Sequence, residues 1–163
     1  MLINTARRLA AAAALVVVAA PVAHAQTATQ TVTFAVNAIN QIGVTGAPSL
    51  TITTATAGSA PTSVTDATAI WAVTTNQTGA KITASIASDM AAGLTLSASL
   101  AAPTGGTSAG FLSLSTTAVD VVTGITKLAQ GSLGVSYKLD ATPAAGVVTS
   151  ATRLVTYTIT GGT

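Results

Sequence analysis

The residues that could carry acid–base or metal chemistry are few in this 163-residue chain. All four acidic side chains are aspartates, and the chain has a single histidine, His24, and no cysteine. His24 falls in the first 25 residues, which we predict are removed from the mature protein. The remaining chain then lacks His, Cys and Glu, so it cannot build a Ser–His pair, a thiolate nucleophile or an imidazole metal ligand.

The four aspartates, Asp66, Asp89, Asp120 and Asp140, do not form a motif. Paired carboxylates can serve hydrolysis or bind calcium. No two of these aspartates are close in sequence, however, and no Asp-x-Asp-x-Asp loop occurs. We expect each to be a solvated charge in a turn or on the outer face of a strand. The sequence therefore predicts no catalytic residue, no cofactor and no metal site, and the protein is not expected to be an enzyme.

The N-terminus predicts export. Two arginines precede an uninterrupted apolar run over residues 9–20, which is too short to span a bilayer comfortably. A proline ends the run, and Ala23-His24-Ala25 has the small-x-small pattern of a signal cleavage site. We predict a signal peptide over residues 1–25 and cleavage between Ala25 and Gln26.

The mature protein would then comprise one domain, residues 26–163. We expect it outside the cell, at the cell surface or in the periplasm, with no stable membrane span. Its four cations, Lys81, Lys127, Lys138 and Arg153, balance the four aspartates. A basic footprint for nucleic acid is absent, and so are the interleaved aromatic residues that stack on bases.

The clearest structural signal is the alternation at the C-terminus. Val155, Tyr157 and Ile159 fall on one face, and three threonines fall on the other, which is the pattern of a half-buried strand. We expect residues 133–139 to be its hairpin partner, with Tyr137 and Tyr157 sharing the core and their hydroxyls reaching its rim.

Similar runs between turn residues predict the other strands. They lie near residues 31–38, 50–52, 68–75, 82–86, 94–100, 111–114 and 119–122. We expect residues 82–86 and 94–100 to form one hairpin, and residues 126–130 to form a single helical turn. About 7–9 short antiparallel strands favour an all-β fold consisting of a single β-sandwich.

The order of these elements resembles bacterial immunoglobulin-like domains. A broken first strand opens the mature chain, with the break near Asn40, and the last hairpin (residues 133–139 and 153–160) follows the helical turn. The resemblance covers the whole mature region and implies an Ig-like sandwich. The chain has no Cys…Trp…Cys framework and no clear tyrosine corner.

Two functions from different classes follow from the sequence. The first is a structural subunit that assembles with copies of itself into a pilus-like fibre, a surface layer or a biofilm matrix. Val32, Phe34 and Val36 lie close to the mature N-terminus on one face of a strand, where they could pair with a neighbour's sheet edge. This segment resembles the donor strand of fimbrial subunits, although the chain lacks their cysteine pair. Pairing of the same strand within its own sandwich is the simpler expectation.

The alternative is a monomeric secreted binding module for adhesion. A rigid sandwich commonly carries its function on loops, and residues 103–110 form a glycine-rich loop that could meet a glycan or a protein. The two functions differ in the state of the mature protein, since the first requires oligomers and the second does not.

Overall fold

The structure is a computed structural model that describes residues 24–162, and these residues form an all-β protein. The chain divides into two units, Met1–Ala35 and Val36–Thr163, and every described strand belongs to the second. Nearly all of the predicted signal peptide lies outside the described residues. Among the residues that are described, no helix is long and apolar enough to cross a membrane.

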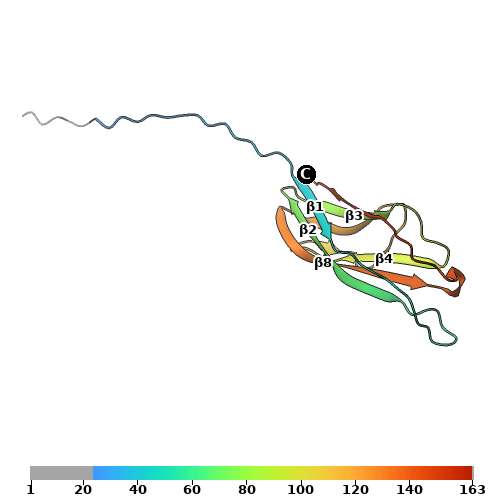
Figure 1. Cartoon of the computed structure of the whole chain (residues 1–163). Helices are drawn as coiled ribbons and strands as arrows, with labels where there is room; N and C mark the ends of the chain where they lie inside the picture. The colour runs from blue at the N-terminus through green and yellow to red at the C-terminus, as the bar shows by residue number, and fades with distance from the viewer. Residues whose placement is uncertain (1–23, 163) are drawn as a thin grey trace, which may run out of the picture. The chain divides into compact units, whose positions relative to one another are not determined.

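The larger sheet has five antiparallel strands in the order β1-β2-β8-β4-β6. Its central strands, β2 and β8, are the longest (Figure 1). The bounds are β1 Asn40–Thr45, β2 Val64–Thr75, β4 Leu94–Leu100, β6 Leu112–Ser113 and β8 Leu128–Ala141.

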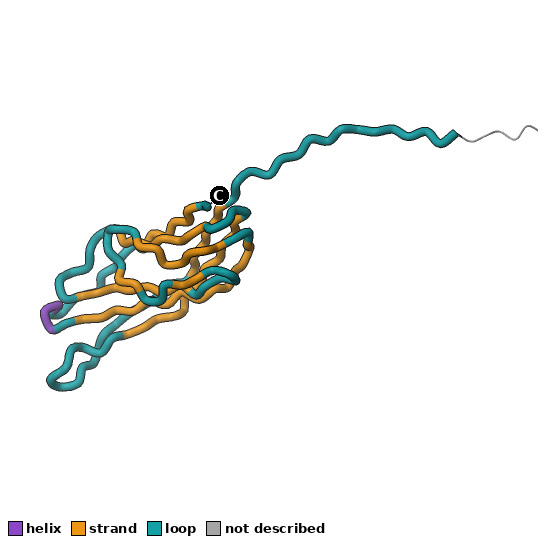
Figure 2. Tube along the Cα trace, turned by 180° about the vertical axis from the view of Figure 1, so that it is seen from behind, coloured by secondary structure: helices purple, strands orange, loops and turns teal. Residues whose placement is uncertain are grey.

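The smaller sheet has four antiparallel strands in the order β5-β7-β3-β9. Figure 2 shows these strands and the loops that connect them to the larger sheet. The bounds are β3 Ala80–Ile86, β5 Thr107–Ser108, β7 Val119–Ile125 and β9 Val155–Thr160. The one described helix is a 3-10 turn, Pro143–Ala145.

A single apolar core lies between the two sheets. Its largest fully buried side chain is Trp71 of β2, packed in one cluster with residues of the smaller sheet such as Ile82 and Val121. β2 and β3 both alternate between buried and more exposed residues, as expected for strands with one covered face. Ile70, next to Trp71, is 44% exposed, so β2 is covered on one face only.

The expected hairpin of residues 82–86 and 94–100 is wrong. Both segments are strands, but β3 belongs to the smaller sheet and β4 to the larger one. The connection between them therefore crosses from one layer to the other. Period-two patterns identify both strands but do not state which edge each strand pairs with.

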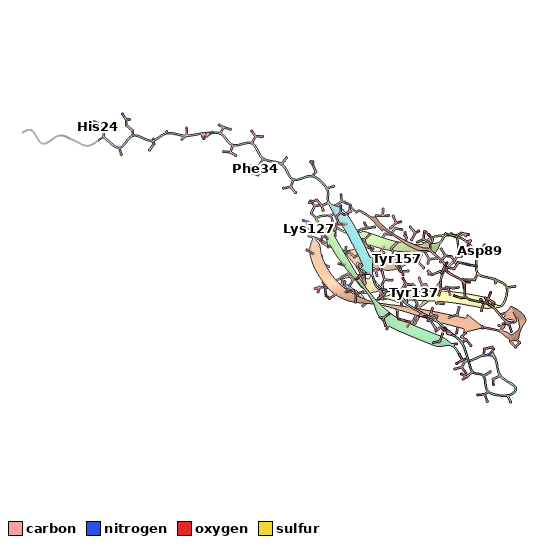
Figure 3. The ribbon with its side chains drawn as sticks, viewed as in Figure 1. His24, Phe34, Asp89, Lys127, Tyr137 and Tyr157 are labelled. Atoms are coloured by element: carbon pink, nitrogen blue, oxygen red, sulfur yellow. The ribbon has the colours of Figure 1, made fainter. Side chains whose placement is uncertain are left out.

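The C-terminal strand has the alternation that its sequence predicts, but not the predicted partner. β9 pairs with β3, with Ile159 opposite Ile82, whereas β8 lies in the other sheet. Tyr137 and Tyr157 do share the core: their hydroxyls are 2.9 Å apart and hydrogen-bonded across the two layers (Figure 3). Burial raises the pKa of Tyr137, and burial together with the hydrogen bond to Tyr137 raises that of Tyr157.

Three further expectations are wrong. Residues 126–130 form no helical turn, because β8 begins at Leu128 directly after Lys127, whose φ is +43°. Residues 50–52 are not a strand; the nearest pairing is an isolated bridge between Ala55 and Pro61. Residues 31–38 belong to neither sheet, and the first strand begins at Asn40.

Asn40 is therefore the start of a strand and not a break within one. Its side chain faces the core opposite the buried Thr75, whose hydroxyl donates to Asn40 Oδ1 at 2.7 Å. Asn40 Nδ2 in turn donates to Gln77 Oε1 at 2.8 Å. These bonds close one end of the core with satisfied polar groups, which explains an asparagine on an apolar face.

Candidate assembly surface

The aspartates are engaged in structural contacts and are not gathered into a site. Asp120 pairs with Lys81 at 3.0 Å, and Asp140 pairs with Lys138 at 3.0 Å. A hydrogen bond from Ser63 is the main cause of a lowered pKa at Asp140. Among the described residues, no three His, Cys, Asp or Glu side chains are close enough together to hold a metal ion.

Asp66 anchors the chain that follows β1. Its carboxylate accepts hydrogen bonds from the hydroxyl and backbone N–H of Thr68, and from the backbone N–H of Ser49 at 2.9 Å. These bonds, the Thr68 hydroxyl foremost, hold the pKa of Asp66 below its usual value. Residues 46–49 are thereby held alongside β2, even though they form no strand.

The residues predicted for assembly are the most exposed apolar side chains of the N-terminal segment, residues 24–39. Val32 is 72% exposed, Phe34 90% and Val36 79%. Figure 3 labels Phe34 on this segment. They keep their period-two spacing, but residues 24–39 contain no assigned strand. Pairing of this segment within its own sheets, the simpler expectation from sequence, is therefore not observed.

Asn76 holds the end of this segment that leads into β1. Its side-chain Oδ1 accepts the N–H of Ile39 at 2.8 Å, and its Nδ2 donates to the carbonyl of Asn37 at 2.8 Å. The backbone N–H of Asn76 also donates to the carbonyl of Ile39 at 3.3 Å. No sequence signal connects Asn76 with Ile39 and Asn37, which lie 37 and 39 residues earlier in the chain.

The core is incompletely covered along one side, where the edge strands β1 and β9 of the two sheets lie next to each other without pairing. Val44 faces the core opposite the buried Trp71, yet it is 37% exposed. The core-facing side chains of β9, Val155, Tyr157 and Ile159, are only partly buried. We call this side of the domain the open side.

A groove of about 650 Å³ continues from the open side, beyond the end of β1 and before the start of β9. One wall is formed by residues 50–55 and the other by residues 148–153, with Leu94 and Leu139 among the residues between them. Its volume is within the range of ordinary ligand pockets. Sequence analysis missed the groove, although two apolar residues at 147 and 148, outside any predicted strand, were a signal.

The two walls have free backbone groups. Within the described residues, no backbone–backbone hydrogen bond involves residues 50–53 or 147–153. Leu50 and Ile52 are partly buried while Thr51 and Thr53 are exposed, so the first wall alternates as a strand does. An alternating segment with unpaired N–H and C=O groups is a template for another strand.

The loop predicted for ligand binding is tied to the body of the domain. Pro103 is buried and its carbonyl accepts from Gly106, while Thr104 N–H donates to Gln130 Oε1 at 2.8 Å. Thr107–Ser108 then forms β5, which pairs with β7. Residues 103–110 are therefore not the unstructured loop that their composition suggests.

Comparison with protein-family models found no matching family, and comparisons with curated proteins and with solved structures found no similar protein.

Proposed function

We propose that this protein is a non-enzymatic structural subunit, exported to the cell surface, that assembles with copies of itself through residues 31–36. We call these residues the assembly segment. The observation that carries the proposal is the exposure of Val32, Phe34 and Val36, which alternate with polar or small residues in a run that contributes to neither described sheet. The product would be a pilus-like fibre, a surface layer or a biofilm matrix.

The energetics support burial of the segment in an assembly. Removing a Val or Phe side chain from water gains roughly 1.5–3 kcal/mol, and strand addition supplies backbone hydrogen bonds as well. Soluble monomers rarely present a continuous apolar face of this kind unless it binds a partner. The two-sheet architecture supports an Ig-like sandwich as the unit that is repeated.

The test is the size and shape of the exported protein, measured by gel filtration and by negative-stain microscopy of the same fractions. We expect large regular particles or filaments. Phe34→Asp places a charge at the centre of the apolar face and should weaken association by about 100-fold or more, as expected for a loss of roughly 3 kcal/mol.

The matched control is Thr33→Asp, which adds the same charge to the polar face of the segment. It should leave the particles largely intact. A monomeric parent protein would refute the proposal, and so would polymers that are unchanged by Phe34→Asp. A monomer would favour the alternative of a binding module for a glycan or a protein.

A further inference from the structure

We infer that the groove between residues 50–55 and 148–153 receives the assembly segment of a second copy of this chain. This inference rests on the proposed function and names the surface that the segment binds. It is argued from four observations: the distribution of exposed apolar side chains, the free backbone of the walls, the charge of the groove, and the reach of the segment.

Exposed apolar residues of the described chain gather at two places. Ten large apolar side chains are exposed, and four of them lie in the N-terminal segment. Four others, Val44, Val147, Val148 and Leu154, lie at the open side or beside the groove. Only Ile70 and Phe111 lie elsewhere. The chain thus carries one exposed apolar strand pattern and one incompletely covered apolar surface.

The backbone and the charges of the two parts also match. Each wall is six residues long, as is the assembly segment. The carbonyls of Thr54 and Thr152 already accept hydrogen bonds, but residues 50–53 and 148–151 have N–H and C=O groups without a backbone partner that a strand can use. Arg153 is the only charged residue lining the groove. Its guanidinium donates hydrogen bonds to the carbonyls of Thr152 and Asp89. Residues 26–39 contain no charged side chain, so the segment brings no second charge into the groove.

The segment is too short to reach the groove of its own chain. The groove begins at Leu50, next to Ser49, which is bonded to Asp66. Asp66 lies nine residues along β2 from Thr75, the partner of Asn40, which is about 30 Å. Phe34 is six residues from Asn40 and can therefore extend at most about 20 Å from it.

The hydrogen bonds of Asn76 shorten this reach further. Because they hold Asn37 and Ile39, Phe34 is attached to a fixed point only three residues away and extends about 10 Å from it. A second copy has no such constraint. The start of β1 and the groove lie at opposite ends of the second unit, so each copy would bind the next head to tail, and such a contact produces a linear filament when it does not close.

The absence of native cysteine allows a direct crosslinking test. The variant carries Thr33→Cys in the segment and Thr149→Cys in the wall of the groove. It is exported, purified and treated with a short bis-maleimide crosslinker. We expect a ladder of covalent oligomers on a denaturing gel. The matched control combines Thr33→Cys with Thr95→Cys on β4 and should give at least tenfold less.

Each outcome separates this inference from the proposed function. Filaments that crosslink equally through Thr95→Cys, or through neither pair, overturn the groove as the acceptor while leaving self-assembly standing. A covalently closed monomer shows that the segment binds its own chain and overturns the inference. A protein that forms no particles at all overturns the proposed function itself.

An insertion tests the argument from reach. Ten Gly/Ser residues inserted between Val36 and Asn37 add up to about 33 Å, which exceeds the shortfall. The segment can then bind its own groove at a high effective concentration, and refolding from denaturant should yield monomers in place of filaments. The same ten residues inserted between Thr29 and Gln30 leave the reach unchanged and should leave the filaments. Filaments of equal yield from both insertions would contradict the inference.

Discussion

The N-terminal segment and strand β9 have nearly the same sequence pattern and opposite environments. Val32, Phe34 and Val36 alternate with polar or small residues and are largely exposed. Val155, Tyr157 and Ile159 alternate with threonine, and their strand pairs with β3 against the core. The period-two pattern thus indicates that one face of a segment is suited to burial. It does not indicate whether that face is buried by the same chain or by another copy.

The largest expected effect is on domain stability, when an aspartate is placed in each of the two regions in turn. Ile159→Asp places a carboxylate opposite the buried Ile82 and should destabilise the domain by about 3 kcal/mol or more. Phe34→Asp should change the stability of the unassembled domain by no more than about 0.5 kcal/mol. Urea denaturation below the concentration of assembly measures both. Equal destabilisation by the two changes would mean that the segment folds onto its own domain.

A smaller effect is expected at the boundary between the regions. Asn76→Ala removes the two side-chain hydrogen bonds to Asn37 and Ile39 and should cost about 1–2 kcal/mol. Amide exchange at Ile39 should accelerate about tenfold, because this N–H loses its acceptor. Thr78→Ala, an exposed change in the same turn, is the control. An unchanged exchange rate at Ile39 would show that Asn76 does not hold residues 37–39.

The period-two pattern of apolar residues predicts where strands lie but not which strands pair. It identified β2, β3, β4, β7 and β9 to within a few residues, because each has one buried face. It did not identify the pairing of β9 with β3, since both strands satisfy the same pattern with any apolar partner. It also proposed a helical turn at residues 126–130, where the positive φ of Lys127 instead allows β7 to lead directly into β8.

The candidate site was predictable in one half only. Val32, Phe34 and Val36 are visible in the sequence because they alternate close to the N-terminus. The groove is formed by two segments about a hundred residues apart, and neither has a strand pattern throughout. The hydrogen bonds that Ser49 donates to Asp66 and that Ile39 donates to Asn76 likewise join distant residues. Such contacts depend on the fold and not on local spacing.

The tyrosine pair allows a second comparison between β9 and the assembly segment. Tyr157→Phe removes the hydrogen bond to Tyr137 across the two sheets and should cost about 1 kcal/mol. The assembly segment has no such polar contact through Phe34, so Phe34→Tyr should leave the stability of the unassembled domain unchanged. Urea midpoints of the two variants at pH 7 provide the comparison. A neutral Tyr157→Phe would show that the bond between the layers adds no net stability.

The smallest expected effect is a pH dependence of the free energy of unfolding that arises from the two sheets and not from the assembly segment. Burial raises the pKa of Tyr137, and burial together with the hydrogen bond to Tyr137 raises that of Tyr157. In the unfolded chain both ionise near pH 10. Above that pH the unfolded state binds fewer protons than the folded state, so the free energy of unfolding falls as the pH rises. Below that pH the tyrosine pair adds no pH dependence.

The double variant Tyr137→Phe with Tyr157→Phe should flatten this decline in urea melts between pH 9 and about pH 11. A decline of equal slope in the double variant would show that the tyrosine pair does not cause it. Phe34→Asp should leave the slope unchanged, because the assembly segment carries no group that titrates there.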